Sequence, residues 1–370
     1  MSVQGASSSS MTSAHRFPWK WRLQDLDKVK RNGKTVFSCF ACGGGSSMGY
    51  KLAGYTVLGN CEIDPKIAAT YKANLHPKYS FVMDVRDFLK LPDEKIPQEL
   101  FNLDVLDGSP PCTSFSTAGQ REKMWGKAKQ FAEGQKLQRL DDLFFTFIAV
   151  ANRLRPKVVV AENVKGLILG NAKGYVHEIA KGFREAGYVV QLFLLNAASM
   201  GVPQTRERTF FVARRKDLSL PKLKLSFVEP PIPFGLVRSA HGKPFTSAAS
   251  KAPWILSKRK KGEDKISLIC KRLGIKEYGF NHIVQPDEDI AHTLVATGSY
   301  YRWCDALNMT EEDIRNISTF PQDYQFTGRS AQFICGMSVP PVMMAQVASQ
   351  IAEQWFGGKT FAQVKEERGG

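Results

Sequence analysis

The sequence predicts an α/β protein with a doubly wound, mostly parallel sheet of seven strands and a smaller, irregular second domain. Three observations predict it. Short β-branched runs alternate with helical patterns between residues 35 and 215, which is typical of a parallel sheet covered by helices. The last two runs follow each other without a helical pattern between them, so we expect the seventh strand to be antiparallel. After residue 215 the chain is rich in Pro, Lys and Gly, which indicates a separate unit.

The elements follow in order along the chain. Seven segments have strand composition: "TVFSCF" (35–40), "TVLGNCEI" (56–63), "YSFVMDV" (79–85), "LDVLDG" (103–108), "KVVVAENV" (157–164), "YVVQLFLLNA" (188–197) and "RTFFVARR" (208–215). Helical patterns occupy 64–75, 138–154 and 174–186. Two later segments also favour helices: 310–320, with Thr310 as N-cap, and 339–356, which begins with prolines.

These elements suggest four parts of the chain. Residues 1–30 are Ser-rich at their start and are expected to form a disordered or weakly ordered tail. Residues 31–213 form the first domain and 214–305 the second. Residues 306–370 return to the first domain, because regular helical patterns reappear there.

The charge of the chain indicates its class of partner. Its 370 residues carry a net charge of +16, which favours nucleic acid and, second, an anionic membrane surface. Residues 214–305 contain 17 Lys and Arg against 9 Asp and Glu, a net +8. No apolar run reaches membrane-spanning length, and the start has no secretory pattern. Seven cysteines, an odd number, favour a reducing, cytoplasmic setting.

A glycine-rich turn follows the first predicted strand. Residues 43–45 are consecutive glycines that precede a helical pattern, so the backbone can approach a ligand there and the helix N-terminus favours an anionic group. Glu62 ends the next strand, where an acidic side chain can accept hydrogen bonds from ribose hydroxyls. Asp84 follows the third strand and can meet an adenine amino group. The sequence therefore predicts a nucleoside cofactor site, with a nicotinamide cofactor and S-adenosylmethionine both open.

A second group of reactive side chains lies at the ends of the fourth and fifth predicted strands and directly before the seventh. Cys112 stands behind two prolines in "GSPPCTSFSTAG" (108–119), and Glu162 ends the fifth strand. "PQTRER" (203–208) adds Gln204, Arg206 and Arg208. A thiol beside guanidinium groups is a competent nucleophile, and a carboxyl group can transfer a proton. The alternative for Glu162 alone is a salt bridge at a strand end.

The pair Cys39 and Cys42 forms a CxxC sequence. This spacing occurs in redox-active turns and in halves of zinc sites. No second pair lies at ligand spacing, so we expect no metal.

Eight motifs in this order resemble the DNA (cytosine-5) methyltransferases of the bacterial and phage type. They are "FACGGGSSMGYKLAGY", "CEIDP", "MDVRD", "GSPPCTSFSTAG", "AENVKG", "GVPQTRERTFFVA", "FPQDY" and "GMSVPPV". The resemblance covers residues 34 to 356. It implies a Rossmann-like fold, S-adenosylmethionine as cofactor, and methylation of carbon 5 of a cytosine flipped out of duplex DNA.

The resemblance also implies residue roles. Cys112 would attack carbon 6 of the cytosine and Glu162 would protonate the ring at nitrogen 3. Arg208 would bind the cytosine oxygen, and Arg206 would lie beside the nucleophile. The implied cofactor-binding residues are Phe40, Ala41, Gly43, Gly44, Gly45, Glu62, Ile63, Asp84, Val85, Pro110, Ser338 and Val339. The implied DNA-binding residues are Ser116, Arg121, Lys123, Gln204, Thr293 and Leu294. Residues 116–139 would close over the DNA, and 214–305 would be the target recognition domain.

The chain departs from the family pattern at four positions. Ser38 stands where the first motif has an acid, and Cys42 where it has a glycine. Met337 replaces the asparagine of the last motif, and Thr113 the glutamine after the nucleophile. Because Ser38 and Met337 fall where the family holds the amino-acid end of the cofactor, we expect a weakened or reshaped methionine-end pocket.

Three other functions stay open at this point. They are a catalytically weak DNA-binding relative, an RNA cytosine-5 methyltransferase of the same fold, and a nicotinamide-dependent oxidoreductase. As partners we expect duplex DNA and a restriction endonuclease that acts on the same site. We further expect a monomer, without a membrane, in the nucleoid-associated cytoplasm of a prokaryotic or phage-infected cell.

Overall fold

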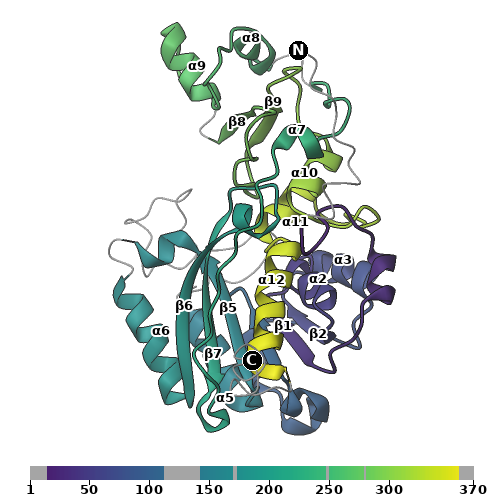
Figure 1. Cartoon of the computed structure of the whole chain (residues 1–370), viewed down its shortest axis with the longest axis vertical. Coiled ribbons are helices and arrows are strands. Elements are labelled where there is room, and N and C mark those ends of the chain that lie inside the picture. The colour runs from purple at the N-terminus through teal and green to yellow at the C-terminus, as the bar shows by residue number, and fades with distance from the viewer. Residues whose placement is uncertain (1–14, 112–141, 170–172, 247–249, 279–280, 358–370) are drawn as a thin grey trace, which may run out of the picture.

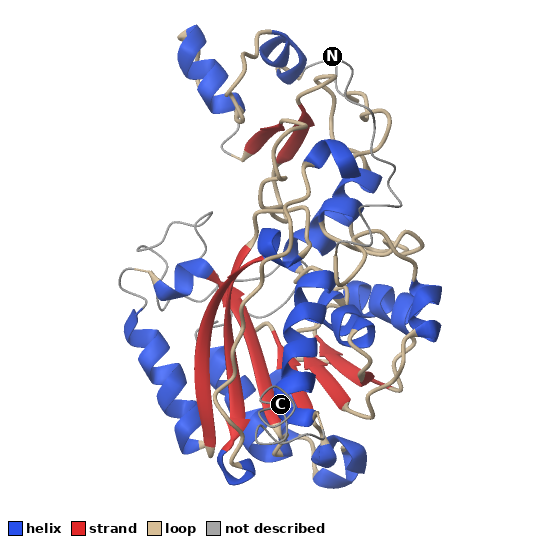
Figure 2. Ribbon diagram, in the orientation of Figure 1, coloured by secondary structure: helices blue, strands red, loops and turns tan. Residues whose placement is uncertain are grey.

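The computed structural model describes residues 15–111, 142–169, 173–246, 250–278 and 281–357. A large α/β part forms one end of the molecule, and a smaller part forms the other (Figure 1). The helices flank the red sheet of Figure 2 on both sides. The chain passes from the large part to the small part and returns along α12.

The central sheet has the strand order β3-β2-β1-β4-β5-β7-β6. β7 pairs antiparallel with both of its neighbours, whereas the other pairings are parallel. This confirms the predicted seven-stranded mixed sheet with an antiparallel seventh strand. The strands are β1 (Thr35–Cys39), β2 (Thr56–Glu62), β3 (Tyr79–Val82), β4 (Val105–Gly108), β5 (Val158–Val164), β6 (Tyr188–Asn196) and β7 (Glu207–Arg215).

Helices pack on both faces of this sheet. One hydrophobic core joins it to α4, α5 and α6, and another joins its opposite face to α2 and α12. α2 and α12 approach closely, because a Cβ at Gly49 would lie 2.5 Å from the Cβ of Met344. The helices of the large part are α2 (Gly45–Leu52), α3 (Pro65–Leu75), α4 (Val85–Lys90), α5 (Asp142–Leu154), α6 (Lys173–Glu185), α10 (Glu311–Ile317), α11 (Ala331–Met337) and α12 (Pro341–Ile351).

The smaller part has its own hydrophobic core, which includes Ile255, Ile269, Val284 and Tyr301. Short elements therefore exist where the sequence showed no long periodic segment. They are α7 (Phe234–Val237), α8 (Ala252–Ser257), α9 (Ile266–Leu273), β8 (His282–Gln285) and β9 (Ser299–Arg302).

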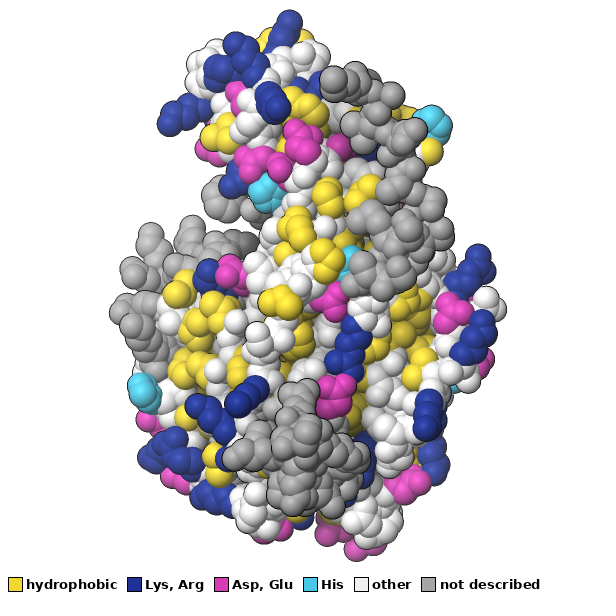
Figure 3. All heavy atoms as spheres, viewed as in Figure 1, with side chains coloured by type: hydrophobic (Ala, Val, Ile, Leu, Met, Phe, Trp, Pro, Cys, Tyr) yellow, Lys and Arg dark blue, Asp and Glu magenta, His cyan; other side chains and the backbone are white. Residues whose placement is uncertain are grey.

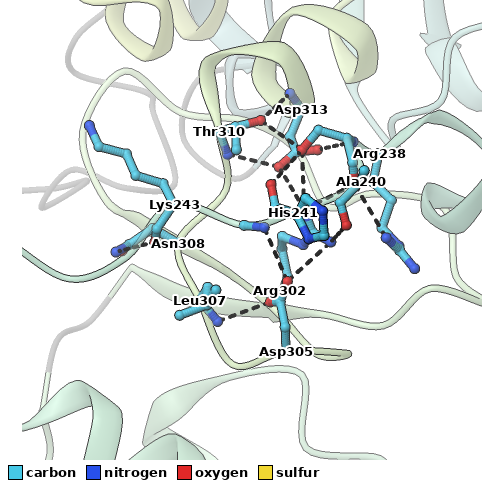
Figure 4. A network of polar contacts seen from close by, with 12 residues as sticks. Arg238, Ala240, His241, Lys243, Arg302, Asp305, Leu307, Asn308, Thr310 and Asp313 are labelled. Carbon is cyan, nitrogen blue, oxygen red and sulfur yellow. Dashed lines mark hydrogen bonds and ion pairs between the residues drawn. The ribbon is translucent and has the colours of Figure 1, made fainter.

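A buried polar network fastens β9 to the start of α10 (Figure 4). Asp313 is fully buried and accepts hydrogen bonds from the backbone of Ser239 (2.6 Å) and Thr310 (2.8 Å). Arg302, also fully buried, donates to the Ser239 carbonyl and lies 3.8 Å from the Asp313 carboxylate. The helix cap of α10 is therefore also the anchor of the smaller part.

The N-terminal segment differs from its prediction. Residues 15–30 are not a loose tail, because Trp21 and Leu26 are buried. The Trp21 indole donates to the carbonyl of Thr319 at 2.9 Å, and Asp323 accepts from the backbone of Leu23 at 2.7 Å. Contacts with a segment 300 residues away, which the Ser-rich composition could not indicate, order this half of the predicted tail.

The helical run Ala331–Phe356 is longer than the helix predicted for residues 339–356. It also contradicts the expectation that no apolar run reaches membrane-spanning length. By length and mean hydropathy it could span a membrane, but 83% of its most apolar stretch is buried inside the protein. It is therefore a core helical run that covers the sheet.

Candidate active site

The glycine-rich turn after β1 is shaped by three left-handed residues. Phe40, Cys42 and Gly44 have φ angles of 54°, 46° and 82°. Such angles favour glycine, so Cys42 occupies a position at which a glycine would fit without strain. The "GMSV" segment packs directly on this turn, since a Cβ at Gly45 would lie 2.1 Å from the carbonyl oxygen of Val339.

Tyr324 of the "FPQDY" motif fixes the turn from the other side. Its hydroxyl donates to the carbonyl oxygen of Gly43 at 2.7 Å. A Cβ at Gly43 would meet that hydroxyl at 2.9 Å and Ile334 at 2.3 Å. The turn is thus held by residues nearly three hundred positions later in the chain.

A cavity of about 280 Å³ opens beside this turn, at the carboxyl ends of β1 to β4. Five predicted cofactor residues line it: Phe40, Glu62, Ile63, Asp84 and Val85. Ser109 and Pro111, from the segment that leads to Cys112, complete the wall toward β4. The cavity thus combines apolar walls with three carboxyl groups, those of Glu62, Asp64 and Asp84.

The carboxyl groups of Glu62 and Asp84 accept hydrogen bonds from backbone amides, and Asp84 also forms an ion pair with Arg86 at 2.6 Å. Glu62 accepts hydrogen bonds from the amides of Cys42 (2.9 Å) and Asp64 (3.1 Å), and its burial raises its pKa. Asp84 caps α4 by accepting from the amide of Arg86 at 2.8 Å. Each carboxyl oxygen can accept more than one hydrogen bond, so both groups suit hydroxyl and amino groups of a ligand.

The other predicted cofactor residues shape the site without lining the cavity. Ala41 and Gly43 to Gly45 form the turn, and Ser338 and Val339 pack against Gly45. Pro110 contributes its carbonyl oxygen, which accepts from Asn163 at 3.0 Å.

The sequence did not indicate the far wall of the cavity. Arg329, Phe333 and Leu143 line it from the segment before α11, from α11 and from α5. Arg329 donates to Asp64 at 3.0 Å, and Asp64 is also the N-cap of α3. No local motif marks these positions, because tertiary packing brings them to the site.

Two of the four departures from the family pattern, Met337 and Ser38, differ in their position relative to the cavity. Met337 lines the cavity and is 52% exposed, as expected for a residue at the ligand. Ser38 does not line it. Its hydroxyl donates to Asp107 on β4 at 2.8 Å, and both side chains are buried. The serine thus contacts a carboxyl group that the neighbouring strand supplies.

Glu162 and Arg208 form a buried ion pair at the ends of two antiparallel strands. Arg208 Nε lies 2.9 Å from Glu162 Oε1, and the register pairs Val164 with Arg208. Burial lowers the pKa of Arg208, while Glu162 opposes this shift. The neighbouring Asn163 donates to Pro110, so the Glu162 strand end is tied to the segment before Cys112.

Arg206 is 2% exposed and lies behind this pair. Its two terminal nitrogens donate to the carbonyls of Leu294 and Gly336, both at 2.8 Å. Its Nε has no hydrogen-bond partner among the described residues. Burial lowers its pKa to about 9. Arg206 therefore joins β7 to the smaller part and to α11.

Two predicted DNA contacts need correction. Gln204 is 1% exposed, donates to Ile317 and accepts from the amide of Leu294. Leu294 is fully buried. Both side chains hold the two parts of the molecule together and present no surface to DNA. Thr293 is half-buried, and its hydroxyl donates to Thr205 at 2.7 Å.

Four predicted residues lie outside the described part of the chain: Cys112, Ser116, Arg121 and Lys123. The expected closing segment 116–139 lies outside it as well.

The CxxC sequence is part of the turn. Burial, with the charge of Glu62, raises the pKa of Cys42 to about 12, and burial also raises the pKa of Cys39. Both thiols are therefore neutral near pH 7, which disfavours redox exchange and metal binding.

This fold and cavity define the class of enzymes that bind a nucleoside cofactor at the carboxyl ends of parallel strands. A family described as C-5 cytosine-specific DNA methylase matches residues 34–353, and the chain belongs to this family. Members of the family use S-adenosylmethionine.

Individual relatives agree with this assignment. The type II methyltransferase M.NgoPII of Neisseria gonorrhoeae is 35% identical over 205 residues, which is 55% of this chain and 54% of the relative. The chain thus spans about half the length of this relative. M.AplI of Arthrospira platensis is 26% identical and covers 90% of both chains. A mutant of Spodoptera frugiperda DNMT2 shares the fold, with a TM-score of 0.61, 14% identity, and coverage of 86% of this chain and 99% of that structure.

Proposed function

We propose that this protein transfers a methyl group from S-adenosylmethionine to carbon 5 of cytosine in a specific duplex DNA sequence. One observation supports this most strongly. The segment that leads to Cys112 lines the cavity through Ser109 and Pro111 and is bound to the Glu162 strand end through Asn163. The described end of this segment thus joins the cavity to the Glu162 strand end, which supports the next residue in the chain, Cys112, as the nucleophile.

The cavity fits S-adenosylmethionine by its chemistry. Glu62 and Asp84 offer acceptors for ribose hydroxyls and an adenine amino group, and the apolar walls at Phe40 and Ile63 suit a purine ring. The turn at Gly43 to Gly45 leaves no room for side chains. Bound S-adenosylmethionine supplies an electrophilic methyl group.

The residues of the chain then activate the base. The Cys112 thiolate forms a bond to carbon 6 of the flipped cytosine, and the electrons of the carbon 5–carbon 6 bond move to carbon 5. Glu162, in its protonated form, donates a proton to nitrogen 3, which stabilises the adduct, and its resulting carboxylate pairs with Arg208. After carbon 5 is methylated it loses its proton, the double bond re-forms, nitrogen 3 returns its proton and the thiolate leaves.

Two arginines assist in different ways. Arg208 pairs with the Glu162 carboxyl group at 2.9 Å, which supports its proposed role in binding the cytosine oxygen. Arg206 keeps the end of β7 attached to α11 through the carbonyl of Gly336. We assign 31–213 with 306–370 to the catalytic domain and 214–305 to the target recognition domain.

The test of this function is label transfer. Wild-type protein is incubated with labelled S-adenosylmethionine and either bacterial genomic DNA or RNA, and the methylated sites are sequenced. We expect label at carbon 5 of cytosine in DNA, and none with Cys112→Ser. Label on RNA alone would instead support the RNA methyltransferase.

We further propose that the protein acts as a monomer in the cytoplasm of a bacterial or phage-infected cell, alongside a restriction endonuclease of the same specificity. The type II naming of the bacterial relatives supports this. Light scattering of the purified protein with and without DNA tests the monomer. A dimer mass would contradict it.

A further inference from the structure

A row of three polar side chains crosses the sheet directly before the cavity. Asn60 of β2, Ser38 of β1 and Asp107 of β4 are neighbours in register. Each precedes a cavity-lining residue by two positions; these are Glu62, Phe40 and Ser109. The row therefore supports three walls of the cavity at once.

Asp107 is the only carboxyl group in this row. It is 2% exposed. Its Oδ2 accepts from the Ser38 hydroxyl at 2.8 Å, and its Oδ1 accepts from the hydroxyl of Tyr50 on α2 at 3.4 Å. At the other end of the row, both side-chain polar atoms of the fully buried Asn60 have no hydrogen-bond partner among the described residues. Since buried polar groups are normally paired, a further polar group is needed to complete this row.

The position of this carboxyl group explains the departure at Ser38. In the family pattern an acid stands at this position of the first strand. Here the chain has serine at that position and an acid directly opposite it on β4, and the two side chains are hydrogen-bonded. The carboxyl group of this pair is therefore carried by β4 and the hydroxyl group by β1.

The hydrogen bonds of Asp107 with Ser38 and Tyr50 join three segments that build the site. β1 leads into the glycine-rich turn, β4 leads through Gly108 to Pro111 and the Cys112 segment, and α2 begins at the end of the turn. We propose that Asp107, through Ser38 and Tyr50, is a positioning residue that fixes the cofactor turn and the nucleophile segment relative to each other. This inference rests on the proposed function, because it assigns the cavity to S-adenosylmethionine.

The ionisation of Asp107 should make cofactor binding depend on pH, which packing alone would not. Burial raises its pKa to about 7, and the charge of Glu162 adds to the shift. The other titratable groups coupled to it are Cys39, Tyr50 and Tyr71, and burial raises the pKa of each, so they stay neutral near pH 7. Asp107 is therefore ionised above pH 7, where a buried negative charge attracts a cationic ligand.

The test is a transposition of the acid. We compare wild type with Asp107→Asn, Ser38→Asp and the double variant Ser38→Asp/Asp107→Ser. Calorimetry measures S-adenosylmethionine binding without DNA between about pH 6 and 8, on either side of the Asp107 pKa, and thermal unfolding measures stability. Asp107→Asn keeps the shape of the side chain, so it separates loss of charge from loss of folding.

We expect Asp107→Asn to fold and to bind S-adenosylmethionine about tenfold more weakly at about pH 8, as for the removal of a charge-assisted hydrogen bond. Its affinity should lose the increase with pH that the wild type shows through neutral pH. Ser38→Asp places two buried carboxyl groups opposite each other and should bind more weakly still. The double variant restores a single acid in the row and should recover most of the affinity.

The inference is overturned if Asp107→Asn binds like wild type with the same pH profile, or if its defect is confined to the melting temperature. A double variant no better than the poorer single variant would also overturn it. These results are separate from the proposed function, because that function fails if wild-type protein binds the cofactor normally but transfers no methyl group to cytosine.

Discussion

At the residue scale, the candidate chemistry depends on the ion pair of Glu162 and Arg208. Both side chains are largely buried, and their Oε1 and Nε atoms are 2.9 Å apart. A buried carboxylate without its partner would be strongly destabilised. The ion pair therefore stabilises the Glu162 carboxylate at a strand end that would otherwise exclude charge.

Replacement of the acid should remove catalysis and leave cofactor binding intact. We expect Glu162→Gln to lower kcat by about 10²- to 10⁴-fold, because the amide cannot donate the proton to nitrogen 3. Single-turnover methylation measures the rate, and calorimetry measures S-adenosylmethionine affinity. A variant with near wild-type kcat would contradict the role of Glu162.

Met337 offers a second test at this scale. Its exposed thioether lines the cavity where the family has an amide. We expect Met337→Asn to lower the dissociation constant for S-adenosylmethionine by up to about tenfold, because the amide adds a hydrogen bond. Leu192→Asn replaces another exposed apolar residue, on β6, and as the control it should change nothing. A sub-micromolar constant for the wild type would contradict a weakened methionine end.

At the element scale, the glycine-rich turn and the "GMSV" segment form one packed unit. A Cβ at Gly45 would lie 2.1 Å from the carbonyl oxygen of Val339, a backbone atom that cannot rotate away. The start of α2 and the start of α12 are therefore held at a separation that only glycine permits.

A matched pair of glycine variants tests this close approach. Gly45→Ala should displace the turn, weaken S-adenosylmethionine binding at least about tenfold and lower the melting temperature. Gly174→Ala in α6 meets nothing within 4 Å. It should stabilise the protein by about 1 kcal/mol at most, through helix propensity. Calorimetry and thermal unfolding measure both. Equal behaviour of the two variants would contradict the packing account.

Local pattern predicted the elements well where side-chain periodicity dominates. The β-branched runs of β1 to β7 and the N-cap Thr310 appear at the predicted places. Long-range pairing was not predictable. Asp107 meets Ser38 across 69 positions, and Arg329 meets Asp64 across 265. Gln204 and Leu294 are buried because the smaller part packs against the larger one. No local sequence motif predicts this packing.

At the scale of the whole molecule, positive charge is concentrated in the smaller part. Half of the net charge of +16 lies in residues 214–305, with 17 basic against 9 acidic residues. Lys and Arg side chains gather on the end of the molecule that carries α8 and α9 (Figure 3). This concentration of positive charge supports the proposal that residues 214–305 contact the DNA.

Removal of exposed lysines in that part should weaken DNA binding without affecting the cofactor. Lys258, Lys260 and Lys261 are exposed. We expect their triple replacement by alanine to reduce the slope of log K against log salt by about 0.9 for each phosphate that a lysine no longer neutralises. Fluorescence anisotropy with labelled duplex measures the slope, while S-adenosylmethionine affinity stays constant. An unchanged slope would place the DNA elsewhere.

The central claim is that Cys112 attacks a cytosine between the cofactor cavity and Glu162. Its most direct test is a duplex with 5-fluorocytosine at the methylated position, because fluorine cannot leave as a proton does and the adduct accumulates. With S-adenosylmethionine present, mass spectrometry of the digested complex should show one DNA adduct per chain, on the peptide that contains Cys112. No adduct, or an adduct on another cysteine, would contradict the account.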